Sequence, residues 1–355
     1  MIDVGLIEKL ARSRGAPAVS ILFSLDAARP GNAIDATLVE HLRHRAVDRV
    51  RADARNRNAR ALVGRVNDAF AELDLSHPPV GVAIYASAEE HHIIELPVRV
   101  AERVSISDAF AIRALIDALE AARPVRVVVL SQRQARCFEA SGGALREVRG
   151  AGFPVEFERM TWTETAHKDL PPGERVEDET LRNELRAVDA ALTAVQARGG
   201  LPVVVVGTER DVSFFRKLSS AASDIIGEVH GNYDFADAHG LGRLVAPVID
   251  EHRRAQQRAA CERVADASNR VAIGIDAVWA AARAGRGHEL VLEAGFRYPA
   301  FRSGDLLEPA APDEATYDDA VEAVVRDVVG SGGTVTVVPD GALADHGHIA
   351  LLLRY

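Results

Sequence analysis

The last part of the chain alternates helix-like and strand-like segments, and this alternation constrains the fold more than any other feature. A helical pattern over 277–284 ends at Gly285 and leads directly into the apolar run 290–292. The pair Gly332-Gly333 then precedes the apolar segment TVTVVP, and the chain ends in GHIALLLRY. A glycine commonly ends a helix, and short apolar runs between helices are typical of buried strands. The pattern predicts an α/β domain at the C-terminus.

Composition narrows the class of protein. A chain of 355 residues predicts two or three cores. Its net charge of -10 argues against a surface that is basic throughout, as generic polyanion binders have. Two cysteines provide neither a disulfide framework nor a metal cage, and we find no secretory signal and no apolar run long enough to cross a bilayer. We therefore expect a soluble, reduced, cytoplasmic protein.

Breaks near Pro124 and near residue 250 predict three domains. They are an N-terminal α/β domain (1–121), a central domain (122–250) and a C-terminal α/β domain (251–355). In the first, alternating apolar patterns predict strands at 18–25, 80–85 and 91–96 and helices over 36–73 and 108–121.

The sequence also predicts the order of strands and helices in the central and C-terminal domains. Three strands are expected first, at 125–131, 134–141 and 144–150, with a turn at 141–143. An irregular segment at 153–178 precedes a helix (179–197), a strand (201–208) and a second helix from about residue 211. Three antiparallel strands followed by helix, strand and helix is the order of an RNase H-like domain. A helical segment follows at 237–268. The expected C-terminal elements are helices at 270–284 and 316–330 and strands at 288–293, 334–338 and 348–354, with an insertion at 295–315.

Three features of the C-terminal segment together resemble one known family. The helix that ends at Gly285, the Gly332-Gly333 pair and the final strand ending in Arg354-Tyr355 are similar to the last domain of archaeo-eukaryotic class I release factors and Pelota. The chain most resembles the bacterial archaeo-eukaryotic release factor-like family. The resemblance implies a C-terminal domain of the kink-turn-binding ribosomal protein type and a ribosomal partner, through rRNA or tRNA.

The resemblance also implies that the C-terminal domain meets a translational GTPase. An acidic group in this domain suits protein contact better than RNA contact; it comprises Asp313, Glu314, Asp318, Asp319 and Glu322.

The chemistry of the family does not carry over to this sequence. Release factors use a Gly-Gly-Gln tripeptide in the central-domain loop, but here the loop 158–178 has Gly173 as its single glycine. The codon-reading Asn-Ile-Lys-Ser motif is absent too, as are a phosphate-binding loop and a cluster of carboxylates for metal-dependent hydrolysis. We expect no catalytic residues and no cofactor.

Candidate RNA-binding residues form two groups. Between residues 43 and 65 the chain carries eight arginines against two aspartates, and helical spacing places several of them on one face. The second group lies in the loop 158–178, where an aromatic side chain can stack on a base. The candidates are Arg43, Arg45, Arg49, Arg51, Arg55, Arg57, Trp162, His167 and Lys168. The alternatives are a solvated helix face and an aromatic residue that anchors its own loop.

Histidines occur in three local groups, at 41 and 44, at 91 and 92, and in the ADHGH segment (344–348). None has the spacing of an established metal motif, so we expect surface histidines and no metal site. The histidines of ADHGH precede the final strand and could contact a partner.

These observations favour a ribosome-associated, non-catalytic factor of the release factor/Pelota type that acts on stalled or idle ribosomes. Two alternatives stay open. One is a peptidyl-tRNA hydrolase-like enzyme with a non-standard site, and the other is a protein-interaction scaffold outside translation.

Overall fold

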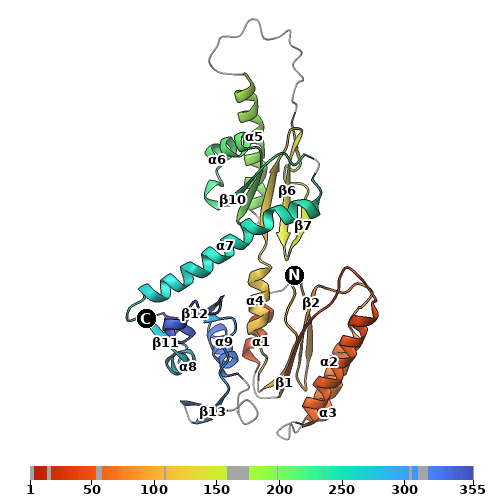
Figure 1. Ribbon diagram of the computed structural model, residues 1–355, viewed down its shortest axis with the longest axis vertical. Coiled ribbons are helices and arrows are strands. Elements are labelled where there is room, and N and C mark those ends of the chain that lie inside the picture. The colour runs from red at the N-terminus through yellow and green to blue at the C-terminus, as the bar shows by residue number, and fades with distance from the viewer. Residues whose placement is uncertain are drawn as a thin grey trace. The chain divides into compact units, whose positions relative to one another are not determined.

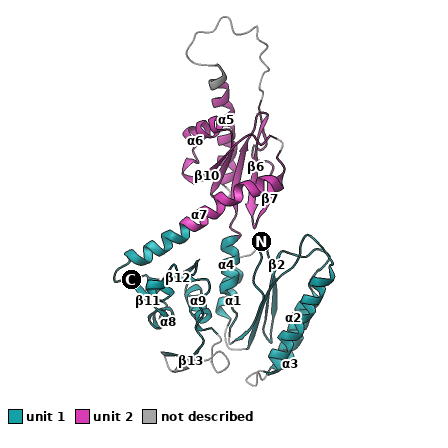
Figure 2. Ribbon diagram, in the orientation of Figure 1, with its two compact units in different colours: residues 1–121, 256–355 teal, residues 122–255 magenta. Residues whose placement is uncertain are grey.

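The computed structural model describes residues 4–13, 17–52, 58–107, 109–157, 176–197, 199–234, 236–303, 306–310 and 319–354. The chain is a mixed α/β protein (Figure 1). It divides into two compact units, one of residues 1–121 with 256–355 and the other of residues 122–255 (Figure 2). Among the described helices, none is long and apolar enough to cross a membrane.

The N-terminal sheet has the strand order β3-β2-β1-β4 and is antiparallel. Its strands are β1 (Ala18–Ser24), β2 (Gly81–Ala86), β3 (His91–Leu96) and β4 (Arg103–Ser107). Strand β2 is buried along its whole length, as its unbroken apolar sequence predicts. The three strands predicted here are confirmed, and β4 is an additional one.

Two helices cover one face of this sheet. The predicted helical stretch 36–73 consists of α2 (Ala33–Ala52) and α3 (Ala59–Ala71). Their apolar residues, such as Leu42 and Leu62, share a core with Ile21 and Ile84 of the sheet. The arginines of α2 consequently lie on its outer side.

The predicted helix 108–121 is shorter than expected, because α4 covers Arg113–Ala121. Side chains of the sheet bind the backbone just before it. The amide of Ala111 donates to Ser20 Oγ at 2.9 Å, and Tyr85 Oη donates to the carbonyl of Ala111 at 3.3 Å. These bonds hold Ala111 against the sheet, so the helix begins after it, at Arg113.

The second face of the N-terminal sheet belongs to a core that continues into the C-terminal segment. Helices α1 (Val4–Arg12), α8 (Ile275–Arg283) and α9 (Ala320–Gly330) contribute to it together with α4. Tyr85 and Leu96 of the sheet, Leu10 of α1, and Trp279 and Val324 of α8 and α9 all belong to this one cluster. The two ends of the chain are therefore parts of a single apolar core.

The C-terminal sheet has the order β11-β16-β12-β15, with β12 and β15 parallel. Its strands are β11 (Val271–Ile273), β12 (Gly287–Glu293), β15 (Thr334–Val338) and β16 (Ile349–Leu353). The predicted helix 270–284 is wrong at its start, because 271–273 pair with β16 and Gly274, at φ +77°, separates strand from helix. The predicted insertion contains a hairpin of β13 (Ala300–Ser303) and β14 (Leu306–Pro309).

The glycines singled out in the sequence have distinct structural roles. Gly285 ends α8 at φ +66°, where its amide and that of Arg286 bind carbonyls of the last helical turn. Gly332 adopts φ +77° after α9. At Gly333 a Cβ would lie 2.6 Å from Val328 Cγ1 and 3.1 Å from the carbonyl oxygen of Gly287. The second glycine is thus required by close packing, and the first by its backbone angle.

The second unit is a sheet of order β10-β9-β5-β6-β7, with the short β8 beside β6. Its strands are β5 (Val125–Leu130), β6 (Gln134–Ser141), β7 (Ala144–Val148), β8 (Val155–Glu156), β9 (Val203–Gly207) and β10 (Ile225–His230). Helices α5 (Val176–Gln196) and α6 (Glu209–Leu218) share a core with one face, and the first part of α7 (Ala238–Asp266) shares a core with the other. The predicted strands are confirmed. Strand β10 was not predicted, because Gly227 and Glu228 interrupt its apolar run.

Candidate functional site

Helix α2 carries the described part of the predicted RNA-contact group. Val39, Leu42, Ala46 and Val50 face the core, which leaves the arginines of the helix outside it. Arg45, Arg49 and Arg51 are exposed, and Arg43 is partly buried. The helical spacing therefore places these side chains on the solvent side, as predicted.

Most of these arginines also bind groups within the chain. Arg43 donates to both carboxylate oxygens of Glu40 and, at 2.8 Å, to Asn67 Oδ1. Hydrogen bonding to Glu40 raises the pKa of Arg43, and the same bond lowers the pKa of Glu40. Arg45 lies 2.6 Å from Glu102. These pairs neutralise part of the positive charge.

Arg49 has a structural role at the edge of the sheet. Its Nη1 donates to the carbonyl oxygen of Val104 in β4 at 2.5 Å. This bond ties α2 to the strand beneath it, so a change at Arg49 tests stability as well as RNA contact. Arg51 is exposed and lies in the last turn of α2. It is the better position for testing a surface charge.

The remaining predicted contact residues are Arg55, Arg57, Trp162, His167 and Lys168, and all of them lie outside the described residues. The described arginines share their surface with Glu40 and Asp48, so that part of the surface is mixed in charge. Such a surface can contact phosphates at single arginines but has no continuous basic stripe.

Histidines of the predicted groups mostly pair with carboxylates. His91 Nε2 lies 3.1 Å from Glu72, and His92 Nε2 lies 3.3 Å from Glu90. Within the described ranges, no three histidine, cysteine or carboxylate side chains come together as metal ligands would.

The ADHGH segment holds the most constrained of these histidines. His348 adopts φ +66°, its Nδ1 lies 2.8 Å from Glu293 Oε2, and its ring stacks on Phe296. Glu293 is buried at the end of β12 and also accepts the amide of Leu343 at 2.7 Å. Burial alone would raise the pKa of Glu293, but these hydrogen bonds outweigh it and lower the pKa below 4.5. Glu293 was not singled out from the sequence, where it is one acidic residue at the end of an apolar strand.

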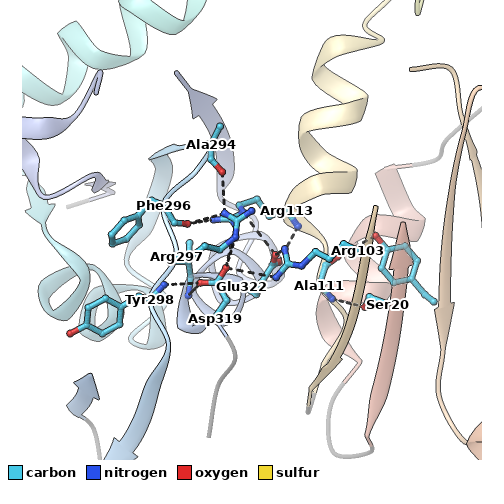
Figure 3. A network of polar contacts seen from close by, with 12 residues as sticks. Ser20, Arg103, Ala111, Arg113, Ala294, Phe296, Arg297, Tyr298, Asp319 and Glu322 are labelled. Carbon is cyan, nitrogen blue, oxygen red and sulfur yellow. Dashed lines mark hydrogen bonds and ion pairs between the residues drawn. The ribbon is translucent and has the colours of Figure 1, made fainter. Parts of the chain in front are cut away.

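Within the expected acidic contact group, Asp319 is buried and Glu322 is partly buried. Asp319 precedes α9 and Glu322 lies in its first turn; both face arginines of the N-terminal segment (Figure 3). Both carboxylates are paired with Arg103 and Arg113 within the chain, so the expectation that these two residues present free surface charges is wrong. The other three acidic residues lie outside the described residues.

The central sheet lacks the acid arrangement that metal-dependent nucleases need. Strand β5 has no carboxylate, and Glu139 of β6 lies 3.6 Å from Arg126 and 3.8 Å from Arg146. Glu139 is thus paired with cations and, among the described residues of this unit, belongs to no group of carboxylates that could hold a metal.

The central segment of the chain matches a known protein family. Residues 125–286 match the model of a family described as bacterial archaeo-eukaryotic release factor family 3. The predicted family resemblance is confirmed. The release factor-like segment includes the central sheet, α7 and α8. No curated protein matches the chain.

Solved structures of release factor-like proteins align with nearly the whole chain but superpose poorly. The archaeal translation termination factor aRF1 is 15% identical, covers 99% of this chain and 96% of its own, and has a TM-score of 0.26. Pelota of Archaeoglobus fulgidus is 14% identical, with 99% and 92% coverage and a TM-score of 0.38. Archaeal Pelota from a ribosome-bound assembly with ABCE1 is 14% identical, with 99% and 94% coverage and a TM-score of 0.43. The family resemblance therefore rests on the sequence match.

Proposed function

We propose that this chain is a ribosome-associated, non-catalytic translation factor of the release factor/Pelota type that acts in the cytoplasm on stalled or idle ribosomes. The observation that carries the proposal is the match of residues 125–286 to a release factor family. The loop that holds Gly-Gly-Gln in release factors has a different sequence here, which favours binding over hydrolysis.

The proposal includes three domains, at 1–121, 122–250 and 251–355. They are an N-terminal α/β domain, an RNase H-like domain and a domain of the kink-turn-binding ribosomal protein type. The order of strands and helices within each segment supports this division, and the first and third domains are joined through one apolar core. Because α7 continues through residue 250, the second boundary is proposed inside a helix.

The proposed partners are the ribosome and a translational GTPase. Archaeal Pelota has been described on the ribosome with ABCE1, and Dom34 of S. cerevisiae interacts with Hbs1. In this chain we propose that α2 and the loop 158–178 contact rRNA or tRNA, and that the C-terminal domain meets the GTPase.

Sucrose-gradient sedimentation of the tagged full chain, from growing and from starved cells, tests ribosome binding. The variant Arg45→Glu/Arg51→Glu reverses exposed charges and leaves the Arg49 bond to β4 intact. Arg12→Glu is the matched control, since Arg12 is an exposed arginine of α1, which packs on the opposite face of the N-terminal sheet. We expect the wild type and the control to migrate with ribosomes and the double variant to lose this binding.

The salt dependence of binding adds a quantitative check. Each lost phosphate contact reduces the slope of log K against log salt by about 1. An unchanged slope for the double variant contradicts RNA contact by α2. Wild-type protein confined to the top of every gradient refutes the translation proposal and favours a scaffold. Release of peptide from peptidyl-tRNA that substitutions in 158–178 abolish favours the enzyme instead.

A further inference from the structure

A buried network of arginines and carboxylates joins the two ends of the chain. Arg103 of β4 and Arg113 of α4 come from the N-terminal segment, and Asp319 and Glu322 come from the start of α9 (Figure 3). Arg113 and Asp319 are 3% and 6% exposed. Residues more than 200 positions apart thus meet where little water can reach them.

Each group of the network has several partners. Arg113 Nη2 lies 3.2 Å from Asp319 Oδ2, its Nη1 donates to the carbonyl oxygen of Phe296 at 2.7 Å, and its backbone amide donates to Glu322 Oε2 at 3.2 Å. Arg103 Nη1 donates to Glu322 Oε1 at 3.0 Å. The guanidinium of Arg113 thus binds a carboxylate and a backbone carbonyl at the same time, which fixes its orientation as well as its charge.

The carboxylates of the network are paired with cations of the protein itself. Arg297 adds a third cation, with its Nε 3.4 Å from Asp319 Oδ2. A cavity of about 10 Å³ lies beside the network, lined in part by Ser105, Ser107 and Arg326. That volume holds roughly one water molecule. The cluster is therefore a contact within the protein.

The polar network joins the same two segments that share the apolar core. Tyr85 and Phe110, which pack edge to face, lie in the core common to the N-terminal sheet and α9. The helix α1 belongs to the same core through Leu10 and packs against α9. The polar network and the apolar core hold the same two segments together.

We propose that Arg103, Arg113, Asp319 and Glu322 form a clasp that holds the N-terminal sheet and the C-terminal segment together as one body. When one charge of the clasp is removed, the two segments separate jointly and α1, α4 and α9 open in one step. This inference does not depend on the proposed function.

The two carboxylates of the clasp both have raised pKa values, so its charge changes with pH. Burial, followed by the neighbouring Glu322, raises the pKa of Asp319 to about 6, and burial raises the pKa of Glu322. Tyr85 of β2 and the arginines Arg103, Arg113 and Arg297 also face the carboxylates. Arg326 of α9 lines the same cavity and is itself paired with Asp327. Since the folded-state pKa of Asp319 is raised, the stability it contributes is full below about pH 4 and is lost as the pH rises through about 6.

Hydrogen exchange of the full chain tests the clasp, with Arg113→Met as the main variant. At pH 8 we expect amides of α1, α4 and α9 to exchange about a hundredfold faster, because removing one partner of a buried ion pair is strongly destabilising. Arg103→Met is a milder second variant, since Arg103 retains more solvent contact than Arg113. At pH 5 the acceleration by Arg113→Met should be smaller, because more of the carboxylates are neutral there.

Arg126→Met is the matched control. Arg126 is 6% exposed, lies 3.6 Å from Glu139 and belongs to the other unit. It should accelerate exchange in the central sheet and leave α1, α4 and α9 unchanged. Acceleration confined to the first turns of α4 and α9 in both clasp variants, with α1 unaffected, would overturn the proposal. A pH-independent effect of Arg113→Met would overturn it as well.

Discussion

Glu293 provides the sharpest stability prediction, because one buried carboxylate holds the segment before the final strand. Its Oε1 accepts the amide of Leu343 at 2.7 Å, and its Oε2 lies 2.8 Å from His348 Nδ1. We consider the substitution Glu293→Gln, which keeps the shape of the side chain and removes its charge.

The magnitude follows from these two bonds. A glutamine can still accept the amide of Leu343 with its single carbonyl oxygen, but without the negative charge. Its amide then faces His348, whose ring can change tautomer and accept, and this exposed ring recovers part of the loss through water. Hydrogen bonds to charged groups contribute about 1.5–3 kcal/mol each, so we expect a loss of about 2 kcal/mol in the free energy of unfolding at pH 7.

The loss of unfolding free energy caused by Glu293→Gln should be smaller at low pH. Because the folded-state pKa of Glu293 is lowered, its stabilisation is present above about 4.5 and is lost as the pH falls through the folded-state value. The difference between wild type and variant should therefore shrink below pH 4.5.

The assay is urea unfolding followed by the fluorescence of Trp279, which is buried in the core of the same unit. Trp162→Phe removes the other tryptophan from all proteins compared. Glu262→Gln is the matched control, since Glu262 is exposed on α7, and it should change stability by less than about 0.5 kcal/mol. A loss below 1 kcal/mol for Glu293→Gln, or one that is equal at pH 7 and pH 4, contradicts this reasoning.

Two further changes test the role of a glycine and of a partly buried carboxylate. Gly333→Ala should cost about 1–3 kcal/mol in thermal or urea unfolding, because its Cβ would meet Val328 at 2.6 Å; a neutral result contradicts the close packing of α9 against β12. Asp189→Ala should cost about 2–3 kcal/mol in the other unit, because the carboxylate accepts from Ser219 Oγ at 2.7 Å and from both the amide and the hydroxyl of Ser220 at 3.0 Å. Its effect should appear in hydrogen exchange of α5 and α6, and a change confined to α9 would contradict the assignment.

Segments with a strong local period could be predicted from the sequence. The strands β1, β2 and β5 and the helices α2, α3 and α7 follow apolar spacing that tertiary contacts do not override. The end of α8 could be predicted because Gly285 is a local signal. The start of α4 could not, because it is set by Ser20 and Tyr85, which lie far away in the sequence.

The candidate site was predicted only in part. Surface placement of the α2 arginines follows from helical spacing, whereas their partners Glu102 and Val104 lie outside the helix. Asp319 and Glu322 looked like surface charges, because an acidic run near the end of a chain is usually solvated. Their pairing with Arg103 and Arg113, more than 200 positions away, places them inside the chain, and no local pattern indicates such pairs.

The shared apolar core has a consequence for synthesis of the protein. A chain is made from its N-terminus, so the sheet residues Tyr85 and Leu96 emerge long before Trp279 and Val324, with which they share that core. The segment 122–255 is complete earlier and can fold before residues 256–355, the second part of the first unit, have been made. Until then α1 and α4 cover only part of this face of the N-terminal sheet, and the rest is an exposed apolar surface on the nascent chain. Translation that stops between residues 122 and 275 leaves this surface exposed, which makes the truncated product a substrate for chaperones and prone to aggregate.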